Sequence, residues 1–313
     1  MIVTLTANPS VDRTVEVAAL VRGAVLRADS ARVDPGGKGV NISRALAANG
    51  LATRAVLPTG GAEGAQLAAL MTAEGIEVVL VPIAGAVRAN ISVVEPDGTV
   101  TKINEPGPTL SPAELEALAV ATLDTARGAE WVAVSGRLPP GAGDDFYAQL
   151  LARLRSAGNQ VALDSSGAAL QLALAAGPAV VKPNADELAE ATGRSVTTLG
   201  DALDAAERLR DKGAGAVLAS LGADGALLVE ATGSYYGEAP VATPRSAVGA
   251  GDALLAGFLA GGGRGPGALI EALAWGAAAT SLPGSRMPTP DLVDRAAVRL
   301  HDAIDHRRVL KGN

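Results

Sequence analysis

Several residue types are scarce in this chain, and each scarcity excludes a class of chemistry. The 313 residues contain no cysteine, which excludes disulfide bonds, thiolate metal sites and cysteine nucleophiles. Only two histidines are present, His301 and His306, so imidazole has almost no part in catalysis or metal binding. Both are interpreted as solvated residues of a polar C-terminal helix. Carboxylates, amines, guanidinium groups, hydroxyls and backbone amides remain to carry the chemistry.

Aromatic residues and positive charge are also scarce. Aromatics make up 2% of the chain against 48% hydrophobic residues, so the core must be aliphatic. A net charge of −7 offers no basic surface for a phosphate backbone, so neither nucleic acid nor an anionic membrane is expected as a partner. The N-terminus lacks a signal peptide's basic region, and the most hydrophobic stretch, 168–181, is interrupted by Gly177 and Pro178. A cytoplasmic protein without a membrane span is predicted.

Short apolar runs of strand length alternate with longer segments of helical period. This alternation is typical of a mostly parallel sheet with helices on both faces. Ligands of such sheets bind at the carboxyl ends of the strands, so the loops there are the candidate site. The runs are Ile2–Ala7, Thr53–Leu57, Glu77–Val81, Glu130–Ser135, Gln160–Asp164, Ala179–Lys182 and Ala216–Ser220.

Two stretches depart from this rhythm. Val11–Asp34 and Arg88–Asn104 alternate like strands without long helices, and the turn signal at 95–98 joins 90–94 to 99–103 as a hairpin. The stretches are expected to pair as a small β-sheet over the strand ends. An edge extension of the main sheet is the alternative reading.

The most informative motif is Val248–Gly257, in which glycines and an acid precede an apolar helical run. Its backbone N–H groups would form an anion site at a helix N-terminus. Asp252 has two readings. It either stabilises the helix dipole, or acts as a base that takes a proton from a hydroxyl during phosphoryl transfer.

Three further segments are ambiguous on their own. Asp34–Asn41 is glycine-rich but lacks the spacing of a P-loop; Lys38 and Asn41 either bind phosphate and a sugar hydroxyl or belong to a structural turn. Val181–Glu187 reads as a strand end followed by a capping box. Ser220–Gly225 reads as a turn between strands unless a nucleotide lies over it.

Together, and in this order, these motifs resemble the ribokinase-like (PfkB) carbohydrate kinase family, especially its branch acting on phosphorylated hexoses. Each motif is weak alone, whereas seven in register over nearly the whole chain are specific. They are Asn8–Asp12, Gly36–Asn41, Asn104–Pro108, Ser135–Gly141, Lys182–Glu187, Ser220–Gly225 and Gly249–Asp252.

The resemblance implies a Rossmann-like α/β core and a small β-sheet lid. Residues 1–10, 35–87 and 105–313 would form the core, and residues 11–34 and 88–104 the lid. A homodimer through lid-to-lid contact is also implied. Sugar phosphate and ATP would be the substrates, with Mg²⁺ as the cofactor.

The resemblance also implies roles for individual residues. Asp252 would be the catalytic base, and the anion hole would consist of Gly249, Ala250 and Gly251. Asn184 and Glu187 would place Mg²⁺ through water. ATP would contact Lys182, Asn184, Ser220, Gly222, Gly225, Gly251 and Ser285. The sugar phosphate would contact Asp12, Gly37, Lys38, Asn41, Arg88, Arg27, Arg137 and Asp252.

Two positions depart from the family pattern: Arg137 replaces a small hydroxyl residue, and Ala247 replaces Thr or Ser. Neither alters the base or the anion hole, so an active enzyme is expected. The implied reaction converts fructose 1-phosphate to fructose 1,6-bisphosphate, with tagatose 6-phosphate and fructose 6-phosphate as alternative acceptors. A non-catalytic regulator that binds the same ligands is the alternative of another class. A nicotinamide-dependent oxidoreductase is disfavoured, because G-x-G-x-x-G is missing after the first strand.

Overall fold

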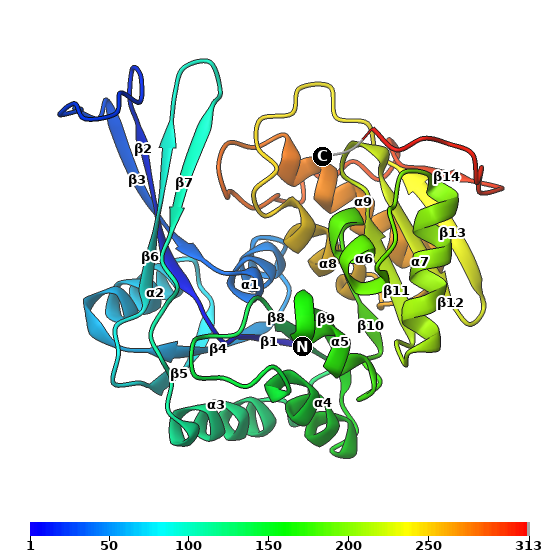
Figure 1. The fold of residues 1–313 in the computed structure, drawn as a ribbon, viewed down its shortest axis with the longest axis horizontal. Helices are drawn as coiled ribbons and strands as arrows, with labels where there is room; N and C mark the ends of the chain where they lie inside the picture. The colour runs from blue at the N-terminus through cyan, green and yellow to red at the C-terminus, as the bar shows by residue number, and fades with distance from the viewer. Residues whose placement is uncertain (312–313) are drawn as a thin grey trace.

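The computed structural model describes residues 1–311, and these form two separate sheets (Figure 1). The large sheet has the strand order β14-β13-β12-β11-β10-β9-β8-β1-β4-β5. Its strands are β1 (Ile2–Thr6), β4 (Thr53–Thr59), β5 (Glu77–Pro82), β8 (Trp131–Ser135), β9 (Gln160–Asp164), β10 (Val180–Val181), β11 (Ala216–Ser220), β12 (Ala226–Glu230), β13 (Gly233–Glu238) and β14 (Arg299–His301).

The seven strands expected from the sequence form the parallel part of this sheet, from β11 to β5. The strands β12, β13 and β14 continue it in antiparallel fashion. The helical interpretation of the C-terminal region was wrong for both histidines. His301 lies in β14 and pairs with Tyr236 of β13, and His306 lies in a turn.

Helices cover both faces of the large sheet because successive strand residues point to opposite sides. In β1, Val3 and Leu5 join one core cluster, whereas Ile2 joins the other. The first cluster packs under α3 (Pro112–Thr125), α4 (Phe146–Ser156), α5 (Gly167–Leu174), α6 (Ala185–Thr192) and α7 (Leu199–Asp211). The second packs under α1 (Lys38–Ala48), α8 (Ala250–Ala260) and α9 (Gly265–Thr280).

The small sheet has the order β3-β2-β6-β7 and stands to one side of the large sheet (Figure 1). Its strands are β2 (Ser10–Glu16), β3 (Ser30–Gly36), β6 (Arg88–Val94) and β7 (Val100–Asn104). The β6–β7 hairpin forms where the turn signal indicates it. The fold is therefore the predicted α/β sheet with a separate β-sheet, and the edge-extension alternative is wrong.

The helix α2 (Gly61–Ala73) packs against both sheets. It supplies Leu67 and Met71 to a third core cluster, which also contains Val11 from the small sheet and Leu57 from the large one. No helix within residues 1–311 is long and apolar enough to cross a membrane.

Candidate active site

The carboxyl ends of the parallel strands place several polar residues at one edge of the large sheet. Thr6 of β1 pairs with Ser135 of β8, and Ser135 pairs with Asp164 of β9. The loops after these strands therefore open on the same side, as expected for a ligand site in a parallel sheet. Lys182 follows β10 at this edge, and Ser220 ends β11 beside Asn184.

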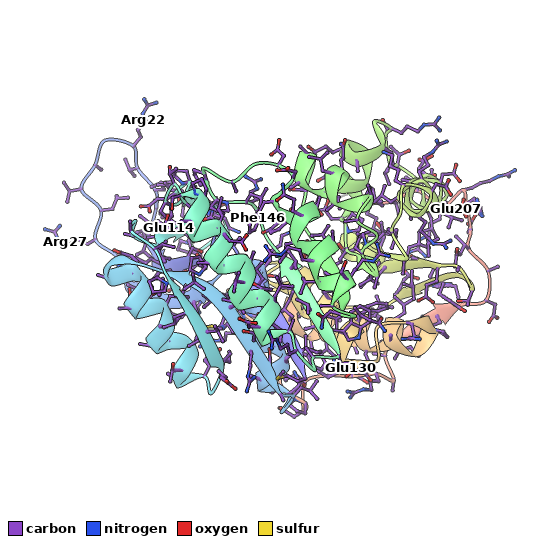
Figure 2. All side chains as sticks on the ribbon, turned by 90° about the horizontal axis from the view of Figure 1, so that it is seen from below. Arg22, Arg27, Glu114, Glu130, Phe146 and Glu207 are labelled. Carbon is purple, nitrogen blue, oxygen red and sulfur yellow. The ribbon has the colours of Figure 1, made fainter. Side chains whose placement is uncertain are left out.

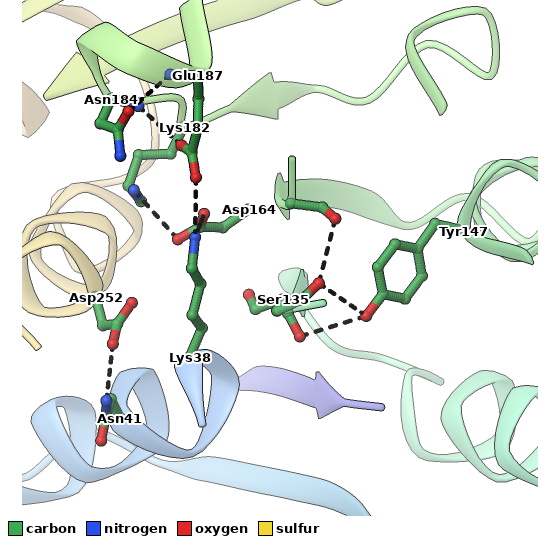
Figure 3. A network of polar contacts seen from close by, with 11 residues as sticks. Lys38, Asn41, Ser135, Tyr147, Asp164, Lys182, Asn184, Glu187 and Asp252 are labelled. Carbon is green, nitrogen blue, oxygen red and sulfur yellow. Dashed lines mark hydrogen bonds and ion pairs between the residues drawn. The ribbon is translucent and has the colours of Figure 1, made fainter. Parts of the chain in front are cut away.

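Asp164 is fully buried at the centre of this edge and pairs with two lysines (Figure 3). Its Oδ1 accepts a hydrogen bond of 2.7 Å from Lys38 Nζ, and its Oδ2 lies 3.2 Å from Lys182 Nζ. Burial by itself raises the pKa of Asp164, but Lys182 and Lys38 outweigh it and hold the pKa below its usual value. The carboxylate therefore stays ionised.

Two glycines allow Lys38 to reach Asp164, because the loop before α1 packs directly on the end of β1. A Cβ on Gly37 would lie 2.7 Å from Thr6 Cγ2, and one on Gly39 would lie 2.5 Å from Thr6 Oγ1. Gly37 also has φ of 123°, which side chains with a Cβ rarely adopt. Burial lowers the pKa of Lys38, but Asp164 and Glu187 outweigh it and raise the pKa overall.

Asp252 lies in the first turn of α8, directed toward the same cluster (Figure 3). Its Oδ2 accepts a 2.8 Å hydrogen bond from Asn41 Nδ2 on α1. Gly249 caps α8 in the left-handed conformation, and no side chain among the described residues caps this helix. The N–H groups at this N-terminus are consequently available to an anion, and the helix dipole favours one there.

Burial and the negative charge of Asp164 raise the pKa of Asp252 to about 6, even though Asn41, Lys38 and Lys182 oppose the shift. A carboxylate of this pKa is ionised at neutral pH and takes a proton more readily than an exposed aspartate does. A role limited to stabilising the helix dipole does not account for the burial of Asp252 or for its hydrogen bond to Asn41.

Asn184 and Glu187 form the predicted capping box at the start of α6. The Asn184 side chain accepts a bond from the backbone N–H of Glu187, and Glu187 Oε2 accepts one from the N–H of Asn184. Glu187 Oε1 faces the site instead, 3.5 Å from Lys38 Nζ. A Cβ on Gly251 would lie 3.5 Å from Lys182 Nζ, so Lys182 approaches the N-terminus of α8.

The small sheet carries two more of the residues predicted from the sequence, Asp12 and Arg88. Asp12 of β2 accepts bonds from Ser10 Oγ at 2.7 Å and from Asn90 Nδ2 at 2.9 Å. Arg88 of β6 donates to the backbone oxygens of Glu105 and Asn8, while its buried Nε has no partner within residues 1–311.

Electrostatics place Arg137 near this pair. Burial lowers the pKa of Arg88; Asp12 opposes the shift and the positive charge of Arg137 adds to it. Arg137 is exposed and follows Gly136, whose φ is 96°. Glu105 also acts on Arg88, so the two guanidinium groups lie among two carboxylates. Guanidinium groups are the side chains best suited to bind a phosphate group.

The remaining predicted residues lie in three places. Ser220, Gly222 and Gly225 belong to the turn between β11 and β12, and Ser220 forms a parallel bridge with Asn184. The Ser285 carbonyl accepts a 3.0 Å bond from Arg44 of α1. Arg27 lies away from the site of its own chain, at the outer end of the loop between β2 and β3 (Figure 2).

The acidic groups match the requirements of a divalent cation that is shared with phosphate. Mg²⁺ is usually held by one or two carboxylates, water and substrate phosphates. Asp164 Oδ2 has no aligned hydrogen bond within residues 1–311, and Glu187 Oε1 points into the same space. No cluster of three or more acidic or histidine side chains in that part of the chain is arranged to hold a metal ion alone. These residues fit a water-mediated site completed by phosphates.

Sequence reasoning missed Asp164, Asn90 and Arg44. Asp164 had a usable signal, since an acid ending an apolar strand lies at the ligand-binding edge of a parallel sheet. Asn90 had none, because its contact with Asp12 depends on the register between β2 and β6. Arg44 was noted only as a residue of the helix. In the structure it is buried and bonds both Glu74 and the Ser285 carbonyl.

Comparison with known proteins agrees with this geometry. The model of the pfkB family carbohydrate kinases matches residues 5–289. The 1-phosphofructokinase of Rhodobacter capsulatus is 42% identical over 263 residues, which is 82% of each chain. The ATP-dependent 6-phosphofructokinase isozyme 2 of Mycobacterium tuberculosis is 35% identical over 300 residues, 94% of this chain and 88% of that one.

Solved structures give the same result. The crystal structure of phosphofructokinase-2 from Escherichia coli in complex with potassium superposes with a TM-score of 0.87 at 32% identity, covering 95% of this chain and 97% of that one. Fold, motifs and site geometry thus agree, and the chain belongs to the pfkB family of carbohydrate kinases.

Proposed function

We propose that this chain transfers the γ-phosphoryl group of ATP to fructose 1-phosphate and forms fructose 1,6-bisphosphate. The observation that carries the proposal is Asp252, a buried carboxylate with a pKa of about 6 at the N-terminus of α8, facing a cluster of lysines. The relatives named 1-phosphofructokinase support the choice of acceptor.

In the proposed reaction, Asp252 takes the proton from the acceptor hydroxyl as that oxygen bonds to the γ-phosphorus. The bond from the γ-phosphorus to the bridging oxygen of ADP breaks, and ADP leaves with the electron pair. The N–H groups of Gly249, Ala250 and Gly251 stabilise the charge on the transferring phosphoryl oxygens, as an oxyanion hole does. Asn41 holds the Asp252 carboxylate in place.

The nucleotide side of the site would use the loops after β10 and β11. Lys182 approaches the glycines of α8 and would contact the phosphates. Ser220, Gly222 and Gly225 would hold phosphates and ribose, and the region near Ser285 would border the adenine. Asn184 and Glu187 would hold Mg²⁺ through water, with Asp164 beside them. The cation supplies charge neutralisation on the phosphate oxygens.

The acceptor side would use the small sheet and the loop before α1. Arg88 and Arg137 would bind the phosphate already present on the sugar, because the two guanidinium groups lie close enough to affect each other's charge. Asp12 would accept hydrogen bonds from sugar hydroxyls. Gly37, Lys38 and Asn41 would line the sugar on the side of the reacting hydroxyl.

The small sheet would act as a lid and as a dimer interface. Residues 11–34 and 88–104 would be this lid, and residues 1–10, 35–87 and 105–313 the core, of which 312–313 lie outside the described residues. Ile91 and Ile103 are paired in register, hence lie on one face of the lid, and are 37% and 58% exposed. A second copy would cover them. Arg27 would then reach a phosphate only in the partner's site.

A panel of acceptors tests the proposal. Purified protein with ATP and Mg²⁺ is given fructose 1-phosphate, fructose 6-phosphate or tagatose 6-phosphate, and ADP release is measured. We expect the highest kcat/KM with fructose 1-phosphate. Preference for fructose 6-phosphate would favour the activity in the name of the Mycobacterium tuberculosis relative, which matches more of the chain. Binding of sugar phosphate and nucleotide without ADP release would identify a non-catalytic regulator.

A further inference from the structure

The last part of the described chain, residues 299–311, forms a strap that crosses the antiparallel end of the large sheet (Figure 1). It begins as β14 on the edge of β13. It then passes the N-terminus of α7, where the N–H of Leu199 donates to the Arg308 carbonyl at 2.9 Å and that of Leu310 donates to Thr197 at 2.9 Å. The C-terminal strap lies outside residues 5–289, which the family model matches.

Arg308 connects the strap to two carboxylates. Its guanidinium donates to both oxygens of Glu238 on β13, with NH1 to Oε2 at 3.1 Å. The same group lies 3.7 Å from Asp224 Oδ1 and 5.3 Å from the centre of the Tyr236 ring. His301 stacks on that ring and bonds Glu238. A bidentate guanidinium over an aromatic ring is an arrangement that lysine does not reproduce.

Asp224 lies in the turn between β11 and β12 and is almost completely buried, at 1% exposure. Its Oδ2 accepts a 2.6 Å bond from the backbone N–H of Lys311 in the strap, and its carbonyl accepts a 2.7 Å bond from Tyr236. Its Oδ1 has no hydrogen bond within residues 1–311. The Arg308 charge therefore compensates a buried carboxylate that has few other partners.

The same turn fits tightly against β13. Gly225 has φ of 86°, and a Cβ on it would collide with the carbonyl oxygen of Gly237. The turn begins at Ser220, which bridges to Asn184 at the ligand-binding edge. Because Asp224 is part of this turn, a shift of Asp224 would also move Ser220, Gly222 and Gly225.

We propose that Arg308 is a positioning residue for nucleotide binding: it holds the turn of Gly222–Gly225 in place and neutralises Asp224 and Glu238 behind it. The inference rests on the proposed function, because that function places ATP on this turn. Without the guanidinium, two carboxylates face each other behind a loop that receives a polyanion, and the repulsion moves the loop. The acceptor site, formed by the small sheet, does not depend on this contact.

The test separates the two substrates. Arg308→Met keeps an apolar side chain and removes the charge. Arg308→Lys keeps the charge but cannot form the bidentate hydrogen bonds of a guanidinium group. We expect the KM for ATP to rise about tenfold in Arg308→Met, the equivalent of about 1.4 kcal/mol. The rise should be smaller in Arg308→Lys, and the KM for the sugar phosphate should stay within about twofold of wild type.

A matched control is Arg153→Met, which breaks the exposed Arg153–Glu116 pair between α4 and α3. It should change neither KM. Calorimetric titration with ADP and thermal unfolding curves accompany the kinetics, so that affinity is measured on folded protein. If Arg308→Lys and Arg308→Met retain the wild-type KM for ATP while their melting temperatures fall, Arg308 is a stability residue only and the inference is wrong. An equal rise in both KM values also overturns it. Wild-type protein that binds no ADP would instead contradict the proposed function.

Discussion

The two sheets of this molecule use their faces differently. Strands β1 and β8 of the large sheet are completely buried, because helices cover both sides. The strand β7 of the small sheet is mostly exposed, and β6 is only half-buried. A sheet covered on both sides holds its strand ends rigidly, whereas one with an open face remains available to a ligand or to a second copy.

The chemistry is divided in the same way. The large sheet holds Asp164 and Lys182, which form a buried ion pair, and packs against the helix that carries the buried Asp252. The small sheet holds Asp12 and Arg88, which are less buried. We infer that the large sheet determines the rate of phosphoryl transfer and the small sheet determines acceptor binding, and the following substitutions test that division.

The largest effect is expected for Asp252→Asn. Loss of the base should lower kcat by about 10²- to 10⁴-fold with little change in either KM. The matched control is Glu114→Gln, which changes another acid in the first turn of a helix, α3, where it belongs to a capping box with Ser111. Steady-state kinetics measure both variants, and undiminished turnover in Asp252→Asn would exclude Asp252 as the base.

Arg88→Met should affect acceptor binding rather than the rate of phosphoryl transfer. Loss of a charged hydrogen-bonding group should raise the KM for the sugar phosphate by about 10- to 100-fold, because such bonds contribute about 1.5–3 kcal/mol. The KM for ATP should change little. Arg54→Met, which breaks an exposed pair with Glu77, is the control. A fall in kcat alone would mean that the small sheet takes part in the chemical step.

The pH dependence should follow Asp252. Its pKa in the folded protein is about 6, so below that pH the base is increasingly protonated and kcat/KM should fall about tenfold per pH unit.

The contribution of Asp252 to the stability of the fold should change with pH in the opposite direction, falling as the pH rises. The pKa is raised from 3.8, so the stabilisation by Asp252 is complete below about pH 4 and is lost as the pH rises through about 6. Urea unfolding from pH 4 to 7 of wild type and Asp252→Asn measures this loss, which should be absent in the variant.

The smallest change in turnover is expected for Ile103→Asp on the small sheet. A charge on the exposed apolar face should dissociate the proposed dimer while the large sheet stays folded. Analytical ultracentrifugation measures the assembly, and thermal unfolding measures the fold. Leu172→Asp, at a position 47% exposed on α5, is the control. An unchanged dimer in Ile103→Asp would place the interface elsewhere.

Much of the large sheet could be predicted from sequence, because its strands are continuous apolar runs between helical segments. The N-terminus of α8 and the capping box of α6 were also readable, since both are local patterns. The pairing of Asp164 with two lysines was not, because it joins the end of β9, the start of α1 and the residue after β10, which are far apart in the sequence. Periodicity at His301 indicated helix, but three residues on the edge of β13 carry too short a pattern to identify a strand.

Asp164 has a thermodynamic consequence through its two lysines. Lys38 is the first residue of α1, and Lys182 directly follows β10. In the proposed function Lys38 faces the acceptor and Lys182 faces the nucleotide. Because one buried carboxylate holds both, a ligand that draws one lysine away alters how firmly the other is held. Linkage then requires reciprocity: the factor by which a bound acceptor changes ATP affinity equals the factor by which bound ATP changes acceptor affinity. If the proposed function holds, a single side chain would couple the binding of the two substrates.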